Sequence, residues 1–258
     1  MTKPAASVTD DTMPIVVINL ERAANRRKSI VAQFADSNIP FEFLTAVDGS
    51  RGDHPLMSHY DPSQSIWYYG KPLTPGAVGC FGSHYLAWQR CVEVGKPIIV
   101  MEDDVAALPH FRRTIGILKP LMAEYPLIRL FGLNERPFRQ VRSVDGMTLI
   151  RFLRGPAGLQ SYAISPRGAE TLLAGAECWR EPVDRYVDRF WSHGLPSLAL
   201  RPYPFFWGDD TSSSTRIWES KSTLITFVGK TRRFFDHFGR HYYNLRQELK
   251  ALAPKNGA

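Results

Sequence analysis

The chain has 258 residues, of which 44% are hydrophobic and 22% charged, and its net charge at pH 7 is +7. This composition fits one large or two small globular domains and excludes a fibrous or fully disordered chain. No apolar run reaches the roughly 18 residues that a membrane-spanning helix needs. The three cysteines lack metal or redox spacing and residues 1–11 lack an apolar signal core, so we expect a cytoplasmic location.

The positive charge suits three kinds of partner: nucleic acid, an anionic membrane, or a phosphorylated substrate. The sequence contains no zinc-finger, RNP or basic-zipper pattern. We therefore expect no nucleic-acid partner.

In chain order, strand and helix patterns alternate from residue 14 onward. A β-branched run over 14–20, a helical pattern over 21–34 and a second strand over 41–47 predict a Rossmann-like opening. Residues 1–12 read as a disordered lead-in and residues 50–75 as an irregular loop near a site. The further predictions are helices over 76–94, 111–125, 166–174 and 182–191, and strands over 97–101, 128–133, 148–153, 161–165 and 198–204.

The last predicted element is a basic amphipathic helix over residues 230–252, which sets a domain of residues 13–229 apart from a C-terminal segment of residues 230–258. Its apolar face contains Phe234, Phe238, Tyr242, Leu245 and Leu249 at helical spacing. Two interpretations stay open: this face packs on its own domain, or it lies on anionic lipid at the inner face of the cytoplasmic membrane. The basic residues on or toward the other side are Arg232, Arg233, Arg240 and Lys250.

Three adjacent acids, Glu102, Asp103 and Asp104, directly follow a short apolar run. The run predicts a buried strand, and open α/β sheets bind their ligands at the carboxyl ends of strands. Three carboxylates repel one another unless a cation or substrate hydroxyls offset their charge. Oxygen ligands of this kind favour Mg²⁺ or Mn²⁺ over zinc.

Several segments occur in a specific order: residues 17–22 with Arg26-Arg27, 41–49, Gly79-Cys80 with Ser83-His84 and Trp88, 99–105, 161–169, and 182–184. Together they resemble the family 25 glycosyltransferases of the bacterial lipooligosaccharide galactosyltransferase type. The chain departs from that pattern at Leu159-Gln160, where a Gly before Tyr162 is more usual.

The resemblance implies a GT-A-type fold, a Rossmann-like α/β architecture with a mixed sheet flanked by helices. It also implies inverting transfer of a hexose, commonly galactose from UDP-galactose, with a divalent metal (Mn²⁺ or Mg²⁺). The implied acceptor is lipooligosaccharide or another glycan or glycolipid. Two rival classes stay open: a glycoside hydrolase, and a non-catalytic nucleotide-sugar or carbohydrate-binding protein.

In such an enzyme the acids would act on the donor. A divalent cation bound by carboxylates offsets the charge that develops on the departing diphosphate. Alternate side chains of an extended segment point to opposite sides, so Glu102 and Asp104 are expected to share a cleft that Asp103 faces away from. We expect Asp104 and Glu102 to bind the metal, Glu102 to reach donor hydroxyls, and Asp103 to orient backbone or contact the donor sugar. An isolated triplet of this kind is more simply an acidic strand cap.

The other expected donor contacts come from the first strand and helix. Asn19 and Leu20 end the strand where a nucleotide would meet the sheet. Arg22, Arg26 and Arg27 follow, and an arginine binds phosphate bidentately. Arg22 and Arg26 are four residues apart and are expected to share a helix face. A solvated basic face explains the same residues without a ligand.

Asp48, Ser83 and His84 complete the expected donor set. Asp48 ends the second strand, where it can accept hydrogen bonds from uridine, although an Asp-Gly turn needs no function. Ser83 and His84 are expected at a helix N-terminus, which favours anions. A capping Ser beside a partly buried His is the simpler alternative.

Inverting transfer needs a base that takes a proton from the acceptor hydroxyl. Asp184 is the candidate, Asp188 is the reserve, and helix capping explains Asp184 equally simply. His193 and the Asp209-Asp210 pair stay open as metal or acceptor contacts. Four aromatic residues suit sugar stacking, although core packing is the default for most of them: Trp179, Tyr186, Trp191 and Trp207.

Overall fold

The structure is a computed structural model that describes residues 13–35, 39–207, 217 and 227–252. The predicted lead-in over residues 1–12 and the Asp209-Asp210 pair lie outside the described residues.

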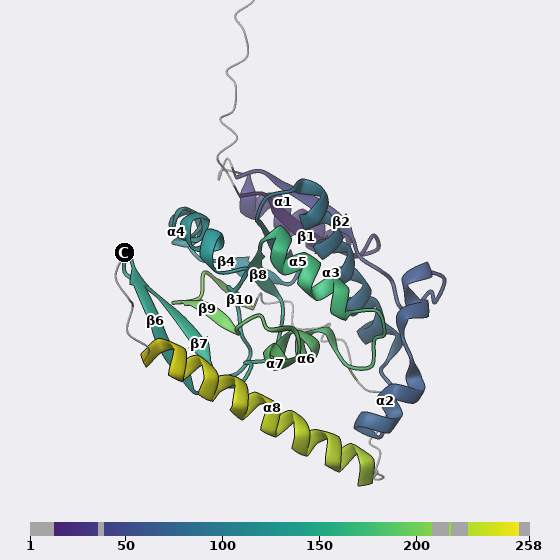
Figure 1. Cartoon of the computed structure of the whole chain (residues 1–258). Helices are drawn as coiled ribbons and strands as arrows, with labels where there is room; N and C mark the ends of the chain where they lie inside the picture. The colour runs from purple at the N-terminus through teal and green to yellow at the C-terminus, as the bar shows by residue number, and fades with distance from the viewer. Residues whose placement is uncertain (1–12, 36–38, 208–216, 218–226, 253–258) are drawn as a thin grey trace, which may run out of the picture.

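An eight-stranded sheet forms the centre of the molecule, in the order β2-β1-β3-β8-β5-β9-β7-β6 (Figure 1). Strands β2, β1, β3, β5, β9 and β6 run in one direction, and β8 and β7 run against them. The strands are β1 (Ile15–Asn19), β2 (Phe41–Thr45), β3 (Ile98–Glu102), β5 (Leu127–Arg129), β6 (Phe138–Val144), β7 (Met147–Phe152), β8 (Ser161–Ile164) and β9 (Leu198–Arg201). A separate two-stranded sheet pairs β4 (Val105–Ala107) with β10 (Phe205–Trp207).

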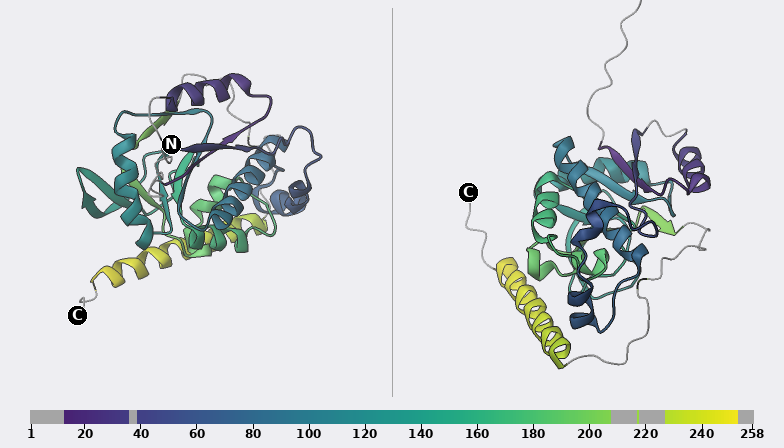
Figure 2. Two further views of the ribbon diagram at one scale, coloured as in Figure 1. Left: turned by 90° about the horizontal axis from the view of Figure 1, so that it is seen from above. Right: turned by 90° about the vertical axis from the view of Figure 1, so that its right-hand side faces the viewer.

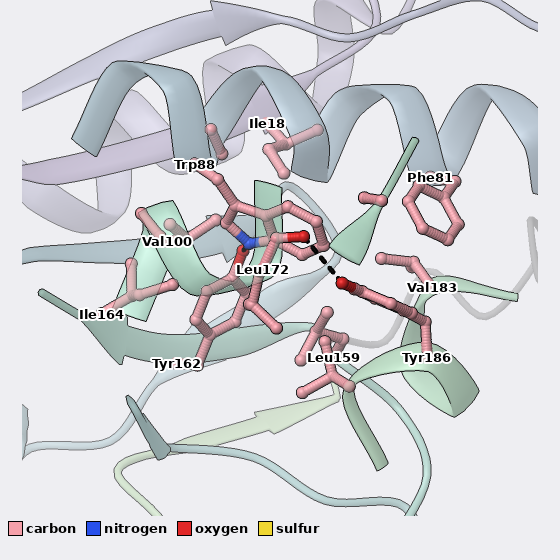
Figure 3. Close-up of a cluster of buried hydrophobic side chains, with 14 of the residues drawn as sticks. Ile18, Phe81, Trp88, Val100, Leu159, Tyr162, Ile164, Leu172, Val183 and Tyr186 are labelled. Carbon is pink, nitrogen blue, oxygen red and sulfur yellow. Dashed lines mark hydrogen bonds between the residues drawn. The ribbon is translucent and has the colours of Figure 1, made fainter. Parts of the chain in front are cut away.

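Helices cover both faces of the large sheet, because its central strands are apolar on both sides. In β3, Ile98 and Val100 join one buried cluster, whereas Ile99 and Met101 join another. Helices α3, α5 and α6 contribute to the first cluster (Figure 3), and α1 and α4 to the second. The helices are α1 (Ala24–Phe34), α2 (Pro62–Tyr69), α3 (Pro75–Val94), α4 (Phe111–Glu124), α5 (Pro166–Gly175), α6 (Val183–Asp188), α7 (Phe190–His193) and α8 (Phe227–Leu252). The predicted mixed α/β fold is confirmed.

The segment predicted as an irregular loop, residues 50–75, contains a 3₁₀ turn at Pro55–His59 and the helix α2. Asp61 caps α2 by accepting from the Ser63 N–H at 2.8 Å, and Pro62 occupies the first turn. Gly70 ends the helix with φ 75°, a conformation that glycine adopts without strain. The prediction was wrong because the helix has weak apolar periodicity, although its capping residues were present in the sequence.

Strand β6 escaped the sequence analysis because its residues are almost all exposed and show no apolar alternation. The strand forms because it pairs with β7 across the turn at Asp145 and Gly146, whose φ values are 46° and 73°. Two successive positive φ values are typical of a tight hairpin turn.

Helix α8 lies along the outside of the domain in each view (Figure 2). It passes α7 and reaches α2. Its polar side is the side that contacts the domain: Arg151 donates to Asn244 at 3.0 Å and to Glu248 at 2.6 Å. Asp236 pairs with Arg189 at 3.1 Å. No helix within the described ranges is long and apolar enough to cross a membrane.

Candidate active site

Two adjoining cavities open where β1 and β3 end. The larger, the acidic cavity, has a volume of about 240 Å³, and the smaller, the strand-end cavity, about 110 Å³. Cys80, Glu102 and Asp104 line both, so the acids lie where the cavities meet. The other residues of the acidic cavity are Ala77, Leu133, Gly158, Leu159, Gln160, Pro182, Val183, Asp184, Trp207 and Ile217. The strand-end cavity adds Ile18, Leu20, Arg26, Ala46, Val47, Ser83, His84 and Asp103.

The three acids divide as the strand geometry predicts. Glu102 and Asp104 both face the acidic cavity, whereas Asp103 does not line it. Asp103 instead accepts hydrogen bonds from Asn19 at 2.6 Å and from Arg26 at 2.9 Å. These contacts tie the turn after β3 to β1 and α1, and they orient the other two carboxylates.

Asp104 is a buried carboxylate with an unfilled acceptor. Burial, and next the charge of Glu102, raise its pKa to about 7, against the opposing effect of Arg26. Its Oδ1 atom is buried and has no hydrogen-bond partner among the described residues. A buried acceptor beside a second carboxylate is costly unless a cation or a donor group binds there. The residues therefore fit a divalent cation.

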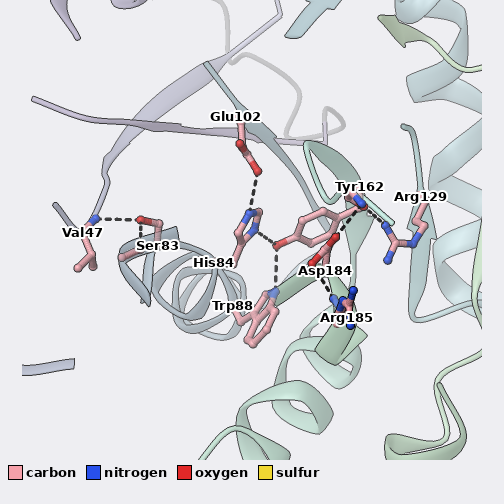
Figure 4. Close-up of polar contacts among 11 residues, drawn as sticks. Val47, Ser83, His84, Trp88, Glu102, Arg129, Tyr162, Asp184 and Arg185 are labelled. Atoms are coloured by element: carbon pink, nitrogen blue, oxygen red, sulfur yellow. Dashed lines mark hydrogen bonds and ion pairs between the residues drawn. The ribbon is translucent and has the colours of Figure 1, made fainter. Parts of the chain in front are cut away.

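A buried hydrogen-bond chain holds Glu102 (Figure 4). Trp88 Nε1 donates to the Tyr162 oxygen at 2.9 Å, and His84 Nδ1 lies 3.0 Å from the same oxygen. His84 Nε2 in turn lies 3.2 Å from Glu102 Oε1. The chain therefore links Glu102 to two buried aromatic side chains and holds the His84 ring in place.

Ser83 and His84 do not lie at a helix N-terminus, so that prediction was wrong. Helix α3 starts at Pro75, and the Thr74 hydroxyl caps it by accepting from Ala77 N–H at 3.2 Å. The backbone N–H groups at 83 and 84 are thus inside the helix and are used by its own hydrogen bonds.

The side chain of Ser83 is used in packing α3 against the turn after β2. Its hydroxyl accepts from Val47 N–H at 2.9 Å and donates to Gly79 at 2.8 Å. A Cβ at Gly79 would lie 2.5 Å from the Val47 carbonyl oxygen. The Gly-Cys…Ser-His pattern therefore has a packing reason for Gly79 and Ser83, whereas His84 reaches the acids.

Of the three arginines predicted to bind phosphate, only Arg26 lines a cavity. The prediction that Arg22 shares a helix face with Arg26 was wrong, because Arg22 precedes α1; it pairs with Asp48 instead. Arg27 lies over the Phe43 ring at 3.9 Å. Two of the three basic side chains are therefore engaged in contacts outside the cavities.

Asp48 and Asn19, also predicted as donor contacts, do not line either cavity. Besides its pairing with Arg22, Asp48 accepts from the Ser50 hydroxyl at 2.6 Å, as an Asp-Gly turn residue does. Leu20 does line the strand-end cavity.

Asp184 and Asp188 occupy different positions although they are one helical turn apart. Asp184 lines the acidic cavity, where it accepts from Gly158 N–H at 3.1 Å. Asp188 is outside that cavity and binds the fully buried Arg129 at 2.6 Å. Burial raises the pKa of Asp188 to about 6, against the effect of Arg129. The geometry favours Asp184 over Asp188 as a group that meets a ligand.

Arg129 and Gln160 were not singled out as site residues. Arg129 donates to the Gly158 carbonyl and to Asp188, so it fixes the loop that forms one wall of the acidic cavity. Gln160 lines that cavity with a buried Oε1 that has no partner among the described residues. Its position was visible in the sequence as the departure before Tyr162.

Cys80, His84 and Glu102 offer ligand atoms within 4.8 Å of one another. Burial and the nearby Glu102 raise the pKa of the Cys80 thiol well above its usual range, which disfavours the thiolate that binds metals. Both nitrogens of His84 are already engaged. The carboxylates of Glu102 and Asp104 are therefore the better donors for a hard cation.

His193 and the four aromatic residues have clear places. His193 bonds the Val187 carbonyl at 3.1 Å, and burial lowers its pKa to about 4, so it holds α6 to α7. Trp179 and Tyr186 are buried in the core, as expected. Trp207 lines the acidic cavity, and Trp191 lines a different pocket.

The sequence family follows from a comparison with known proteins. Residues 12–187 match the family model described as "Glycosyltransferase family 25 (LPS biosynthesis protein)". The chain belongs to glycosyltransferase family 25. The resemblance stated from the motifs is confirmed, and the family match covers β3, the acids after it and Asp184.

Individual relatives differ in what their names say. "Procollagen galactosyltransferase 1" of Danio rerio is 27% identical over 250 residues, covering 81% of this chain and 40% of the relative. "Glycosyltransferase 25 family member" of Aedes aegypti is 35% identical over 185 residues, covering 67% of this chain and 30% of the relative. "Probable inactive glycosyltransferase 25 family member 3" of Rattus norvegicus is 26% identical over 250 residues, covering 84% of this chain and 44% of the relative. The chain spans less than half the length of these relatives, and family 25 membership does not by itself establish turnover.

Proposed function

We propose that this family 25 protein is an inverting, metal-dependent glycosyltransferase that moves a hexose, galactose in the first instance, from a UDP-sugar to a glycan. The observation that carries the proposal is the acidic cavity itself. Glu102 and Asp104, with the unpartnered Asp104 Oδ1, share it with Asp184, a separate carboxylate. Through a bound cation, Glu102 and Asp104 suit the donor phosphates. Asp184 suits the acceptor hydroxyl.

Glu102 and Asp104 would hold the divalent cation, Mn²⁺ or Mg²⁺. When bound, the cation would offset negative charge on the diphosphate as the glycosidic bond breaks. His84 would keep Glu102 oriented through the Nε2 contact of 3.2 Å. Asp103 would hold the turn through Asn19 and Arg26.

In the transfer step, Asp184 would accept the proton of the acceptor hydroxyl. The hydroxyl oxygen forms a bond to the anomeric carbon, and the bond from that carbon to the phosphate oxygen breaks. UDP leaves with the electron pair, and the sugar inverts its configuration. Asp184 suits this role because its Oδ2 accepts only from the Gly158 N–H among the described residues and the side chain still lines the cavity.

The donor is proposed to span both cavities, with its nucleotide toward the strand-end cavity and its sugar toward Asp184. Leu20 and Arg26 line the nucleotide end. Trp207 offers an aromatic face at the other end, where the sugars meet. The acceptor in this proposal is lipooligosaccharide or another envelope glycan.

The direct test is release of UDP from a panel of UDP-sugars, with glycan acceptors, in the presence of Mn²⁺ or of EDTA. We expect UDP release from UDP-galactose with Mn²⁺, and its loss in EDTA with recovery when metal is restored. Full activity in EDTA would contradict the metal assignment. Release of free sugar from glycans without UDP-sugar would indicate a hydrolase instead.

A second function is favoured by the relatives whose names include "inactive". A protein of this kind would bind a nucleotide sugar or a glycan without turnover. Tight UDP-galactose binding with no UDP release across a broad acceptor panel would support it.

The C-terminal helix supports a further part of the proposal, that the enzyme works at the inner face of the cytoplasmic membrane. The apolar side of α8 faces outward, with the side chains of Phe234, Phe238, Tyr242, Leu245 and Leu249 between 58% and 68% exposed. Its polar side is the one that binds the domain. The helix contains six Lys or Arg residues against two acids, Asp236 and Glu248, and both acids pair with the domain.

An outward apolar face with a basic excess is the pattern of a helix that lies on anionic lipid. We expect the chain to bind vesicles containing phosphatidylglycerol more tightly than vesicles of phosphatidylcholine alone. Phe238→Ser with Leu245→Ser should weaken binding by at least about tenfold, since each side chain is worth roughly 1.5–3 kcal/mol when buried. Co-sedimentation measures both effects.

The matched control is Val31→Ser with Val141→Ser, which changes two side chains of 49% and 41% exposure elsewhere on the surface. Equal loss in both double variants, or no binding of the unmodified chain to anionic vesicles, would rule out this role for α8.

A further inference from the structure

A second polar pocket lies on the other side of the loop that forms the wall of the acidic cavity. This basic pocket has a volume of about 280 Å³ and lies among α2, the loop at residues 154–157, α6, α7 and α8. Ala157 lines the basic pocket and Gly158 lines the acidic cavity. Likewise Asp188 faces the basic pocket, and Asp184, one helical turn earlier, faces the acidic cavity. One loop and one helical turn therefore separate the two.

Five arginines line the basic pocket: Arg136, Arg154, Arg185, Arg189 and Arg240. They come from segments far apart in the sequence, including α6 and α8. A cluster of guanidinium groups around a cavity is the arrangement that proteins use to bind carboxylate or phosphate groups.

The pocket also contains three acids, but each already has a partner. Glu181 accepts from the Tyr69 hydroxyl at 2.5 Å and lies 3.6 Å from Arg189. Asp236 pairs with Arg189 at 3.1 Å. Asp188 pairs at 2.6 Å with Arg129, which lies outside the pocket. None of these internal pairs involves Arg136 or Arg154.

Two of the pocket arginines, Arg136 and Arg154, lack a carboxylate partner in the described part of the chain. Arg136 and Arg154 form no ion pair or hydrogen bond there, and Arg136 Nε is buried without an acceptor. Arg240 donates to His237 Nε2 at 2.8 Å and shares the charge of Asp236 with Arg189. Burial, and next the charge of Arg154, lower the pKa of Arg240, as expected for cations that face one another. An anion bound between them would relieve this repulsion.

Aromatic rings form part of the same wall. Tyr68, Tyr69 and Trp191 line the pocket beside the arginines, and Trp191 is only partly buried. Arg189 lies over the Tyr68 ring at 5.5 Å and the Trp191 ring at 5.9 Å. Flat aromatic faces suit the C–H face of a sugar ring, and arginines suit an acidic substituent on it.

We propose that the acceptor is an acidic glycan, whose carboxylate or phosphate group binds in the basic pocket while the hydroxyl to be glycosylated reaches Asp184 in the acidic cavity. The inference rests on the proposed function and names the acceptor class for the same site. The glycan chain passes over the loop at residues 155–158, which Arg129 and Asp188 hold in place.

The test measures binding of three probes to the full chain: methyl glucuronide, methyl glucoside and inorganic phosphate. The glucuronide and the glucoside differ in their acidic group, and phosphate represents the other acidic source. We expect at least one of the two acidic probes to bind. If the pocket binds a carboxylate, the glucoside should bind at least tenfold more weakly than the glucuronide. The double variant Arg136→Gln with Arg154→Gln should weaken binding of the acidic probe by at least tenfold.

Arg154→Gln alone is the second variant; because Arg154 is exposed, we expect this substitution to leave the fold intact. The matched control is Arg142→Gln, which changes an exposed arginine on β6 that pairs with Glu124. Binding of the acidic probes that is equal in all four proteins, or no binding of either acidic probe, would overturn the inference.

UDP-galactose hydrolysis without acceptor is measured alongside. If hydrolysis and transfer occur but the arginine variants bind acidic probes and use acidic acceptors normally, the inference fails and the proposed function stands. If no UDP-sugar is turned over although the pocket binds its acidic probe, the proposed function fails and the acidic-ligand site stands.

Discussion

Replacing Asp104 with Asn is expected to reduce sugar transfer by about 100-fold or more at ordinary metal concentrations, because a bound cation supplies several kcal/mol of charge stabilisation. Asn keeps the size of the side chain and removes the charge beside Glu102. The measurement is UDP release at fixed UDP-galactose over a range of Mn²⁺ concentrations. Part of the loss should be recovered at high Mn²⁺, because Glu102 remains.

Asp53→Asn is the matched control, since this exposed acid pairs with Arg51 and lines neither cavity. It should leave Mn²⁺ affinity within a few-fold of the unmodified protein. Unchanged sugar transfer by the Asp104→Asn variant at ordinary Mn²⁺ concentrations would contradict the assignment of Asp104 as a metal ligand. Equal Mn²⁺ dependence of both variants would mean that the cation binds elsewhere.

Asp184→Asn is expected to lower the turnover number by about 10²–10⁴-fold, the usual contribution of a general base. Binding of UDP-galactose should change little, because the proton transfer concerns the acceptor. Near-normal turnover with an unchanged pH profile would mean that the base is another residue.

Asp188→Asn distinguishes the role of Asp188 from that of Asp184 through its effect on stability. Arg129 is fully buried, and without the charge of Asp188 it becomes an uncompensated cation. The free energy of unfolding should fall by about 3–5 kcal/mol in urea denaturation. Asp184→Asn, whose side chain accepts only backbone N–H groups among the described residues, should lower it much less.

The strand with its acids is the clearest case of what local sequence predicts. An apolar run placed β3 in the interior, and period-two alternation put Glu102 and Asp104 on the same side. Helix starts were predicted less well: Arg22 was assigned to a helix that begins only at Ala24, and Ser83 to a helix start that Thr74 places earlier. Thr74 and Pro75 begin α3 two turns before Ser83.

Contacts between distant segments could not be read from the sequence. The chain Trp88–Tyr162–His84–Glu102 joins α3, β8 and β3, and the pairing of Arg129 with Asp188 joins β5 to α6. No spacing rule brings such residues together, because sheet order and helix packing set which side chains meet.

Helix α8 shows the same division. Its period and its basic excess are properties of the sequence, but which side faces the domain depends on Arg151 and Arg189, far away in the chain. The sequence by itself determined the α/β class, family 25 and the acids that end β3, because these depend on local patterns and motif order. Only the tertiary structure decided that Asp184 and not Asp188 faces the acids, and that a basic pocket adjoins them, because both depend on long-range packing.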